Sequence, residues 1–303
     1  IKGFNVELSP EEFFSQVEKN GVAVVGQSGN LTPADKKLYA LRDVTATVDS
    51  LPLIVSSIMG KKLAADDDCI VLDVKTGSGS FMKTVEQSRE LAEVMVDIGR
   101  RAGKKMRALI TDMDRPLGNN IGNSLEVIEA IEILKGKGAE DLKYVAKALA
   151  SEIVSLSKNI PVTEAENLVS DAIKSGKALE KFKEWIVSQG AKNELPQFKK
   201  ADFTYDITAS CDGYIVSTDA EKIGVAAVIT GAGREKKDDT IDMSAGIILN
   251  KKTGDKISKG DVIATLYSCN QQSFKSAEEK FLSALEFSQT PPENEPLIYS
   301  VIK

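Results

Sequence analysis

The stretch Cys69–Lys83, CIVLDVKTGSGSFMK, decides the fold class of this chain. Its first part, Cys69–Val74, is a continuous and largely β-branched apolar run, which is typical of a strand buried in a parallel sheet. The rest is a glycine-rich loop with hydroxyl side chains, and residues 84–103 behind it have the pattern of a helix. Open α/β sheets bind ligands where a strand ends in such a loop. The spacing fits neither a dinucleotide fingerprint nor a P-loop.

The same pattern continues on both sides of this stretch. A second strand is predicted at Arg107–Thr111, and apolar periodicity predicts helices at 124–134, 139–157, 163–175 and 177–188. Upstream, Ser9-Pro10-Glu11-Glu12 is a capping box that begins a helix ended by Gly21. Further expected elements are a short buried strand at Val22–Val25, a helix that begins at Thr32-Pro33-Ala34-Asp35, and a helix over Ser50–Ala65.

The polar stretch 190–200 marks the expected domain boundary. Residues 1–200 are predicted to form a central, mixed α/β sheet domain with associated helices, including a helical-domain segment near 32–65. Residues 201–303 are predicted to form a smaller α+β C-terminal domain with a barrel-sandwich-like sheet, because short strands alternate there with glycine turns. A last amphipathic helix is expected at Ser276–Phe287.

Barrel-sandwich sheets also occur in lipoyl and biotinyl carrier domains, which present a modified lysine at a hairpin tip. Lys251 and Lys252 would be the available lysines in this chain. Their flanking residues do not match a carrier's modification motif, and two adjacent lysines near a turn are commonly solvated.

Arg42, Ser57 and Lys61 form the candidate binding set of the region 42–62. If Pro52 lies in the first turn of a helix, Ser57 and Lys61 are four residues apart and share one face. Two fixed cations and a hydroxyl suit a planar, oxygen-rich ring that gains negative charge as it leaves. The alternative is a solvated helix face, since most Lys and Arg side chains are exposed.

Composition narrows the classes of function. The chain has 303 residues, a formal net charge of −6 and no histidine. The acidic balance argues against a nucleic-acid partner, and the absence of histidine excludes Ser-His-Asp and Cys-His catalysis. Three scattered cysteines do not indicate a disulfide framework. No apolar run reaches the length of a membrane span, so a cytoplasmic location is expected.

Several separated motifs carry a resemblance to a known family. They are Arg42–Lys62, the stretch Cys69–Lys83, the segment Thr111–Ala130 (TDMDRPLGNNIGNSLEVIEA), and the C-terminal pieces 231–234, 241–242, 245–247 and 254–256. In this order they resemble pyrimidine-nucleoside phosphorylase, the bacterial relative of thymidine phosphorylase. The resemblance implies a glycosyltransferase that cleaves pyrimidine nucleosides with inorganic phosphate, giving the free base and a (deoxy)ribose 1-phosphate.

The resemblance also implies roles for individual residues. Arg42 and Lys61 match the base-contacting cations and Ser57 matches the serine that hydrogen-bonds the ring. A monovalent cation, potassium, is expected at the main-chain oxygens of Leu117 and Asn120 and the carboxylate of Glu129, because oxygen ligands suit a hard cation. The alternative for Glu129 is an ordinary exposed helix residue. No other cofactor is implied, and the full-length protein is expected to be a homodimer.

The family's phosphate-binding segment has no counterpart in the sequence, and we expect it upstream of Ile1. The chain is therefore expected to be the C-terminal part of a phosphorylase and inactive by itself. Two alternatives stay open: a non-catalytic pyrimidine-binding protein, and one subunit of a split phosphorylase. A related phosphoribosyltransferase of the same broad fold is a weaker possibility, because such enzymes bind a diphosphate-bearing sugar through other motifs.

Overall fold

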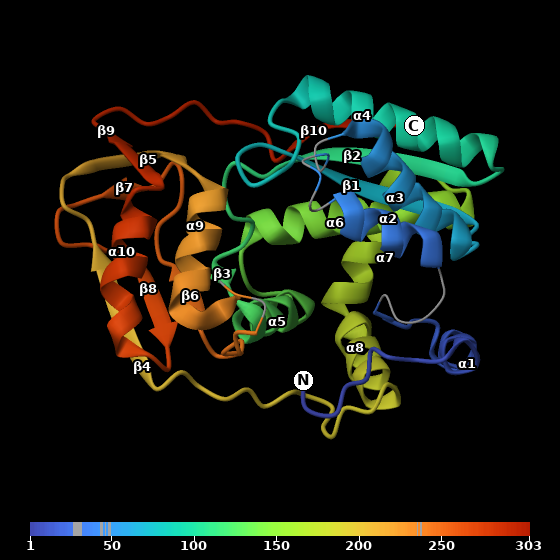
Figure 1. The fold of residues 1–303 in the computed structure, drawn as a ribbon, viewed down its shortest axis with the longest axis horizontal. Helices are drawn as coiled ribbons and strands as arrows, with labels where there is room; N and C mark the ends of the chain where they lie inside the picture. Colours follow the sequence, from blue (N-terminus) through green and yellow to red (C-terminus); the bar gives the residue numbers. More distant parts are fainter. Residues whose placement is uncertain (27–31, 43–44, 46, 48–49, 235, 237) are drawn as a thin grey trace.

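The computed structural model describes residues 1–303 except 27–31, 43–44, 46, 48–49, 235 and 237, and it does not describe the side chains of residues 36, 40 and 42. The chain has an α/β part built on a small sheet and a smaller C-terminal part built on two sheets, which lie side by side (Figure 1).

The first sheet has the strand order β1-β2-β10. Its strands are β1 (Cys69–Thr76), β2 (Lys105–Asp112) and β10 (Ile298–Ile302). β1 and β2 are parallel, paired from Cys69↔Lys105 to Thr76↔Asp112, and α4 (Val85–Arg101) makes the crossover. Alternate residues of β1 are buried with apolar residues of α4, as a strand covered by a helix requires. The predicted strand–loop–helix unit is confirmed.

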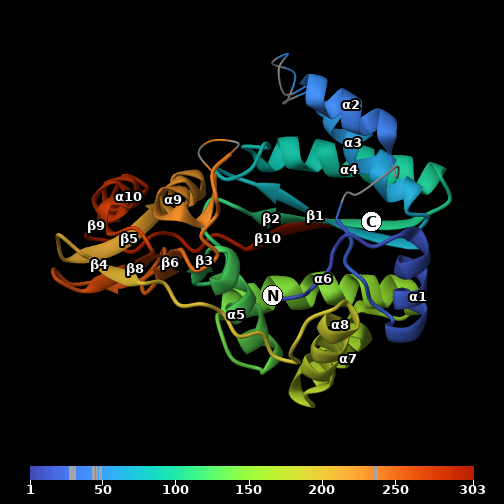
Figure 2. The ribbon, with the colours of Figure 1, turned by 60° about the horizontal axis from the view of Figure 1, so that its bottom comes forward.

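Helices cover both faces of this sheet (Figure 2). On one face, α4 is joined by α2 (Pro33–Arg42) and α3 (Leu51–Ala64); on the other lie α1 (Pro10–Asn20), α6 (Glu140–Lys158), α7 (Val162–Lys174) and α8 (Lys177–Ser188). Ser9 and Glu12 form the predicted capping box of α1, and Gly21 ends that helix with φ +73°. The cap predicted for α2 does not form: the Thr32 hydroxyl, which would accept the capping hydrogen bond, is buried and has no hydrogen-bond partner.

The C-terminal part is a sandwich of two sheets, with orders β3-β6-β8-β4 and β7-β5-β9. Its elements are β3 (Asn120–Ile121), β4 (Phe203–Thr208), β5 (Gly213–Thr218), β6 (Gly246–Leu249), β7 (Lys256–Ile257), β8 (Val262–Ser268), β9 (Leu285–Ser288), α9 (Ala220–Ala227), η1 (Val228–Ala232), η2 (Gln271–Ser273) and α10 (Phe274–Leu282). Ile207, Ile215, Ile247 and Phe281 are fully buried between these elements. The barrel-sandwich-like shape follows from this core.

Two strands connect the parts across the predicted boundary. A coil runs from the end of α8 to β4, along the lower edge in Figure 1. β3, which precedes α5 (Asn123–Leu134), pairs with β6 of the C-terminal sheet, and β10 pairs antiparallel with β2 of the first sheet. The last residues of the chain therefore belong to the α/β sheet, so each part donates a strand to the other.

Two predicted elements differ from those in the structure. Val22–Val25 is coil, because the backbone N–H and C=O of Val24 are bound by the side-chain amide of Gln189 (2.9 and 2.8 Å) instead of by a strand. The helix expected over Ser276–Phe287 ends at Leu282, and β9 begins at Leu285. Leu285 and Phe287 alternate into the sandwich core, a period of two that overrides the helical pattern.

Candidate functional site

A small pocket lies between α2 and α3, where the sequence places the candidate binding set. Its volume is about 110 Å³. The lining residues are mostly apolar or hydroxyl-bearing: Asp35, Leu38, Tyr39, Leu41, Thr45, Thr47, Leu53, Ser56 and Ser57. Ser57 is buried on α3, with 6% of its surface exposed, so it lies inward as the predicted helix face requires.

Lys61, one turn after Ser57 on α3, is held by two residues of α2. Its Nζ lies 3.3 Å from Asp35 Oδ2 and 5.7 Å from the centre of the Tyr39 ring. The lysine side chain is 32% exposed and that of Asp35 is 15% exposed. The ion pair and the aromatic face both attract the ammonium. Lys61 is therefore paired and partly buried, and not a purely solvated side chain. Arg42 ends α2, and its side chain lies outside the described residues.

Asp35 and Tyr39 line the pocket and contact Lys61, and the sequence alone did not single out either as a candidate site residue. The signal was present, because Asp35 and Tyr39 are four apart on a predicted helix and so share one face. Asp35 was interpreted only as a helix-cap residue, in the role of the Glu of a capping box. In the structure Asp35 Oδ2 is buried without a hydrogen bond, although Lys61 Nζ is close by.

The second predicted group, around Glu129, forms a closed loop. Glu129 is buried on α5, with 6% exposed; its Oε1 accepts from the Asn119 N–H (2.8 Å) and its Oε2 from the Asn120 N–H (3.1 Å). The exposed-helix interpretation of Glu129 is therefore wrong. Gly118 has φ +78°, and a Cβ there would lie 2.4 Å from Glu129 Oε2, so the loop needs glycine.

This loop has the chemistry that a hard cation needs. Glu129 is a buried carboxylate, and none of the ion pairs among the described residues includes it. Each of its oxygens accepts one bond and keeps acceptor capacity. In the described part of the chain no cluster of three or more His, Cys, Asp or Glu side chains could hold a metal ion. A site here would therefore depend on one carboxylate and main-chain carbonyls, the donor set of a weakly held, hard cation.

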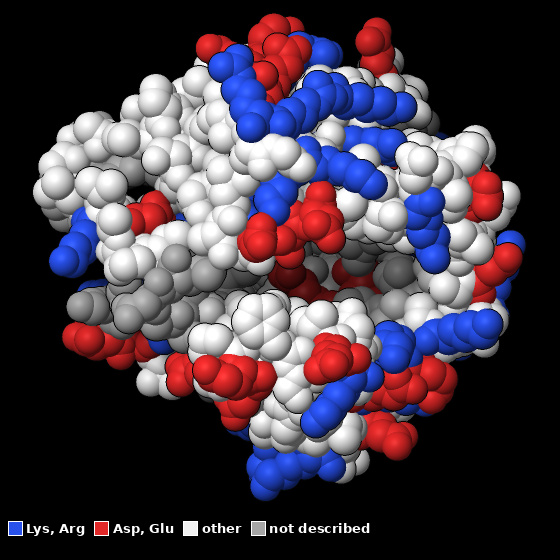
Figure 3. Space-filling model, turned by 90° about the vertical axis from the view of Figure 1, so that its right-hand side faces the viewer, with Lys and Arg blue, Asp and Glu red and all other residues white. Residues whose placement is uncertain are grey.

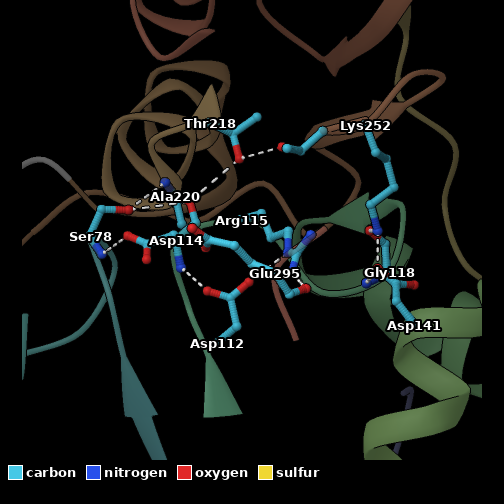
Figure 4. Close-up of polar contacts among 11 residues, drawn as sticks. Ser78, Asp112, Asp114, Arg115, Gly118, Asp141, Thr218, Ala220, Lys252 and Glu295 are labelled. Atoms are coloured by element: carbon cyan, nitrogen blue, oxygen red, sulfur yellow. Dashed lines mark hydrogen bonds and ion pairs between the residues drawn. The ribbon is translucent and has the colours of Figure 1, made fainter. Parts of the chain in front are cut away.

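Lys252, one of the two lysines of the carrier alternative, is tied to the α/β part. Its Nζ donates to the Gly118 carbonyl (2.7 Å) and pairs with Asp141 of α6 (Figure 4). Lys251 binds within its own hairpin region, to the Lys256 carbonyl at 3.3 Å. A carrier lysine must be free at the end of a mobile hairpin, and Lys252 is not.

A dense polar junction joins the two parts beside this loop (Figure 4). Asp112 is 1% exposed at its side chain and accepts from the Asp114 N–H (2.9 Å) and from Arg115 Nε (2.6 Å). Asp114 accepts from the Ser78 N–H (2.7 Å), and Ser78 Oγ accepts from the Ala220 N–H (3.1 Å). The glycine-rich loop is thereby fixed to the start of α9.

The junction also lines a polar, partly open cavity of about 300 Å³. Arg115 Nη2 donates to the Glu295 carbonyl (2.7 Å), so the segment between β9 and β10 is attached at this cavity and forms part of its lining. Burial, and next the nearby Asp112 carboxylate, raise the pKa of Tyr299 above its ordinary value. Asp112 and Arg115 thus find their hydrogen-bond partners within the protein. We therefore interpret the cavity as part of the contact between the two parts of the molecule.

The end of the molecule that carries α2 and α3 is hollowed (Figure 3). Acidic atoms lie in the hollow, and both basic and acidic side chains lie around it, so the visible part of this face has no single sign of charge. Among the described helices, none combines the length and the apolar character that crossing a membrane requires.

The sequence is similar to known proteins over both parts of the molecule. Residues 1–179 match the glycosyl transferase family, a/b domain, and residues 214–288 match the pyrimidine nucleoside phosphorylase C-terminal domain. A pyrimidine-nucleoside phosphorylase of Geobacillus stearothermophilus is 48% identical over 310 residues, covering 100% of this chain and 71% of the relative. One from Bacillus subtilis is 52% identical over 273 residues, covering 88% of this chain and 63% of the relative.

These matches run along both parts of the molecule, while the chain spans roughly two thirds of the relatives' length, 71% and 63% in these two cases. The α/β part and the sandwich each correspond to a matched domain. The chain therefore belongs to the glycosyltransferase family of the pyrimidine-nucleoside phosphorylases.

Proposed function

We propose that this chain provides the base-binding part of an enzyme that cleaves pyrimidine nucleosides with inorganic phosphate. The products are the free pyrimidine and a pentose 1-phosphate. The observation that carries the proposal is the position of Lys61, whose ammonium is held between Asp35 and Tyr39 at a pocket that Ser57 lines. The relatives with this name support the substrate class.

The chemistry needs a donor at the leaving base. As the bond between the sugar's anomeric carbon and the ring nitrogen breaks, its electron pair stays on the pyrimidine, and a phosphate oxygen forms the new bond to that carbon. Lys61 places a positive charge and N–H donors where this negative charge develops, and Ser57 adds a hydroxyl donor to the ring. Preorganised donors of this kind are worth about 10²–10³ in rate each.

Asp35 and Tyr39 would prepare Lys61 for this role. The carboxylate keeps the lysine charged and directs it, and an ammonium with three protons can donate to a base oxygen while it stays paired with Asp35. The Tyr39 ring supplies a flat apolar surface of the kind on which a planar base stacks. Arg42 completes the set on the resemblance alone.

The Glu129 loop would hold the potassium ion that we predict. Glu129 would contribute its carboxylate, and Leu117 and Asn120 their carbonyl oxygens. When bound, such an ion supplies fixed positive charge close to where a phosphate is held. We include in the proposal a homodimer as the full-length form, a cytoplasmic location, and an isolated chain that lacks phosphorolysis, since the phosphate-binding segment of the family has no counterpart in it.

The test is phosphate-dependent release of uracil from uridine and thymine from thymidine, measured for this chain and for the full-length protein. We expect release by the full-length protein alone. Direct uracil binding to this chain, measured calorimetrically, should be lost in Lys61→Met and kept in Lys62→Met, whose lysine is exposed next to it. A full-length protein without phosphorolysis would overturn the proposal, and uracil binding that ignores Lys61 would overturn the assignment of the base site.

A further inference from the structure

Three residues form a clamp between the two parts of the molecule: Lys252 in the β6–β7 turn, Asp141 in the first turn of α6, and Gly118 in the loop after β2 (Figure 4). Lys252 Nζ donates to the Gly118 carbonyl at 2.7 Å and pairs with Asp141 Oδ2. The same carboxylate oxygen accepts from the Gly118 N–H at 3.4 Å. The Lys252–Asp141 ion pair thus binds both the carbonyl and the N–H of Gly118.

The clamp is built into the fold. The side chains of Lys252 and Asp141 are 22% and 20% exposed, whereas solvated lysine–carboxylate pairs elsewhere on the molecule, such as Lys181–Glu184, exceed 50%. Asp141 Oδ1 also accepts from the Leu142 N–H at 2.8 Å, which fixes the carboxylate in the first turn of α6. A half-buried ion pair that is also hydrogen-bonded to backbone has one geometry, while an exposed pair has many.

The peptide that the clamp holds is part of the Glu129 loop. Beside Gly118, the Asn119 N–H donates to Glu129, and the Asn119 carbonyl accepts from the Leu249 N–H at 2.8 Å. β3 then pairs with β6, in the register Asn120↔Ile248. The C-terminal part therefore contacts this loop at three successive residues, 118 to 120. The contact at Gly118 is made by a charged side chain, and the other two are made by backbone groups.

We propose that Lys252 and Asp141 are positioning residues that set the geometry of the Leu117–Asn120 loop, and so the affinity of the cation site that Glu129 closes. This inference rests on the proposed function for the presence of that site. Lys252 fixes the direction of the Gly118 carbonyl, in the peptide segment between the two proposed carbonyl ligands, Leu117 and Asn120. Asp141 neutralises the ammonium, which would otherwise repel a cation bound close by.

Through Lys252, the C-terminal part would influence the affinity of the cation site in addition to stabilising the fold. Outer-shell groups that orient metal ligands typically affect metal affinity by about 10–100-fold. Because the two clamp residues act through one peptide, removing either should have a similar effect, and removing both should add little.

The experiment is a potassium titration of the thermal midpoint of the full-length protein, at constant ionic strength with choline chloride as the substitute salt. Its readout is independent of turnover. We expect the apparent potassium affinity to fall about tenfold in Lys252→Met and in Asp141→Asn, and to recover in Lys252→Arg, which keeps the charge and N–H donors. Lys251→Met is the matched control and should titrate like wild type, because Lys251 contacts only its own domain.

An unchanged potassium affinity in Lys252→Met and Asp141→Asn would overturn the inference. It would also be overturned if potassium did not raise the thermal midpoint of the wild-type protein above its value in choline chloride. An equal loss in Lys251→Met would also overturn it, because the effect would then be one of surface charge. A wild-type protein that shows the potassium effect and no phosphorolysis would remove the proposed function while leaving the clamp in place.

Discussion

The α2–α3 pocket and the junction around Asp112 differ in whether their buried carboxylate oxygens are hydrogen-bonded within the protein. At the pocket, Asp35 Oδ2 is buried without a hydrogen bond although Lys61 Nζ lies close by, and Leu38 and Leu41 are 60% and 58% exposed. At the junction, Asp112 accepts on both oxygens and is almost completely buried. The pocket therefore keeps a buried acceptor and exposed apolar surface available to a ligand, whereas both carboxylate oxygens of Asp112 have partners within the protein.

This contrast separates residues that bind from residues that hold the fold. Buried polar groups normally find partners within the protein, and those that do not are common where a ligand or another segment supplies the partner. Substitutions at the pocket should therefore lower binding and turnover with little loss of stability. Substitutions at the junction should lower the free energy of unfolding.

The largest effect is expected for Lys61→Ala in the full-length protein. We expect kcat for phosphorolysis to fall about 10²–10³-fold, because a donor to the leaving base is lost. The free energy of unfolding should change by less than about 1 kcal/mol, since the Lys61–Asp35 pair is partly exposed. Steady-state kinetics and urea unfolding measure the two quantities, and Lys62→Ala is the control. Near-normal turnover would contradict the base-site assignment.

Arg115→Ala tests the opposite side of the comparison. Removal of the guanidinium leaves the Asp112 carboxylate buried without its charged partner and frees the Glu295 carbonyl. The expected cost is about 3 kcal/mol of unfolding free energy, measured by urea unfolding of this chain.

The double variant Asp112→Asn, Arg115→Ala is the control for that pair. Its cost should be smaller than the sum of the single costs, because the two residues share one interaction. Full additivity would show that Asp112 and Arg115 stabilise the junction independently.

Gly118→Ala tests whether the loop needs glycine for its backbone conformation alone or also because a Cβ would collide with Glu129. Gly118 and Gly136 have nearly the same φ, +78° and +80°, but a Cβ at Gly136 meets nothing within 4 Å. Gly136→Ala should cost about 1 kcal/mol for a left-handed alanine. Gly118→Ala should cost about 2 kcal/mol or more, because the new methyl group displaces Glu129. Equal costs in urea unfolding would mean that the loop can move away from Glu129.

The sequence predicts the elements better than it predicts the contacts between them. Local signals were sufficient for the α1 capping box, the β1–loop–α4 unit and the amphipathic helices α6–α8, because neighbouring residues determine caps and periodicity. The strand predicted at Val22–Val25 failed, because its backbone partner is the side chain of Gln189, far along the chain. No local pattern reports such a partner.

The candidate site shows the same division. Ser57 and Lys61 followed from spacing within one helix; the structure confirms that helix and buries Ser57, and their role in binding stays a prediction. Tyr39 and Asp35 required the packing of α2 on α3, and the partners of Lys252 lie 111 and 134 residues away in sequence. A lysine beside a turn has the same local appearance whether it is solvated or clamped, so only the fold distinguishes the two.

The smallest effect is expected at Asp242, in the turn that precedes β6. Burial by itself would raise its pKa, but hydrogen bonds from Ser244 and Cys269 outweigh burial and hold the pKa below the ordinary 3.8. A lowered carboxyl pKa stabilises the fold above the unfolded value, and that contribution is lost as pH falls through the folded pKa. Asp242→Asn should therefore lower the thermal midpoint of this chain by about 2–4 °C at neutral pH, the equivalent of about 1 kcal/mol. The difference should shrink as the pH falls below the ordinary value of 3.8, because the wild-type carboxylate then takes up its proton. A difference independent of pH would show that Asp242 stabilises the loop by its shape and not by its charge.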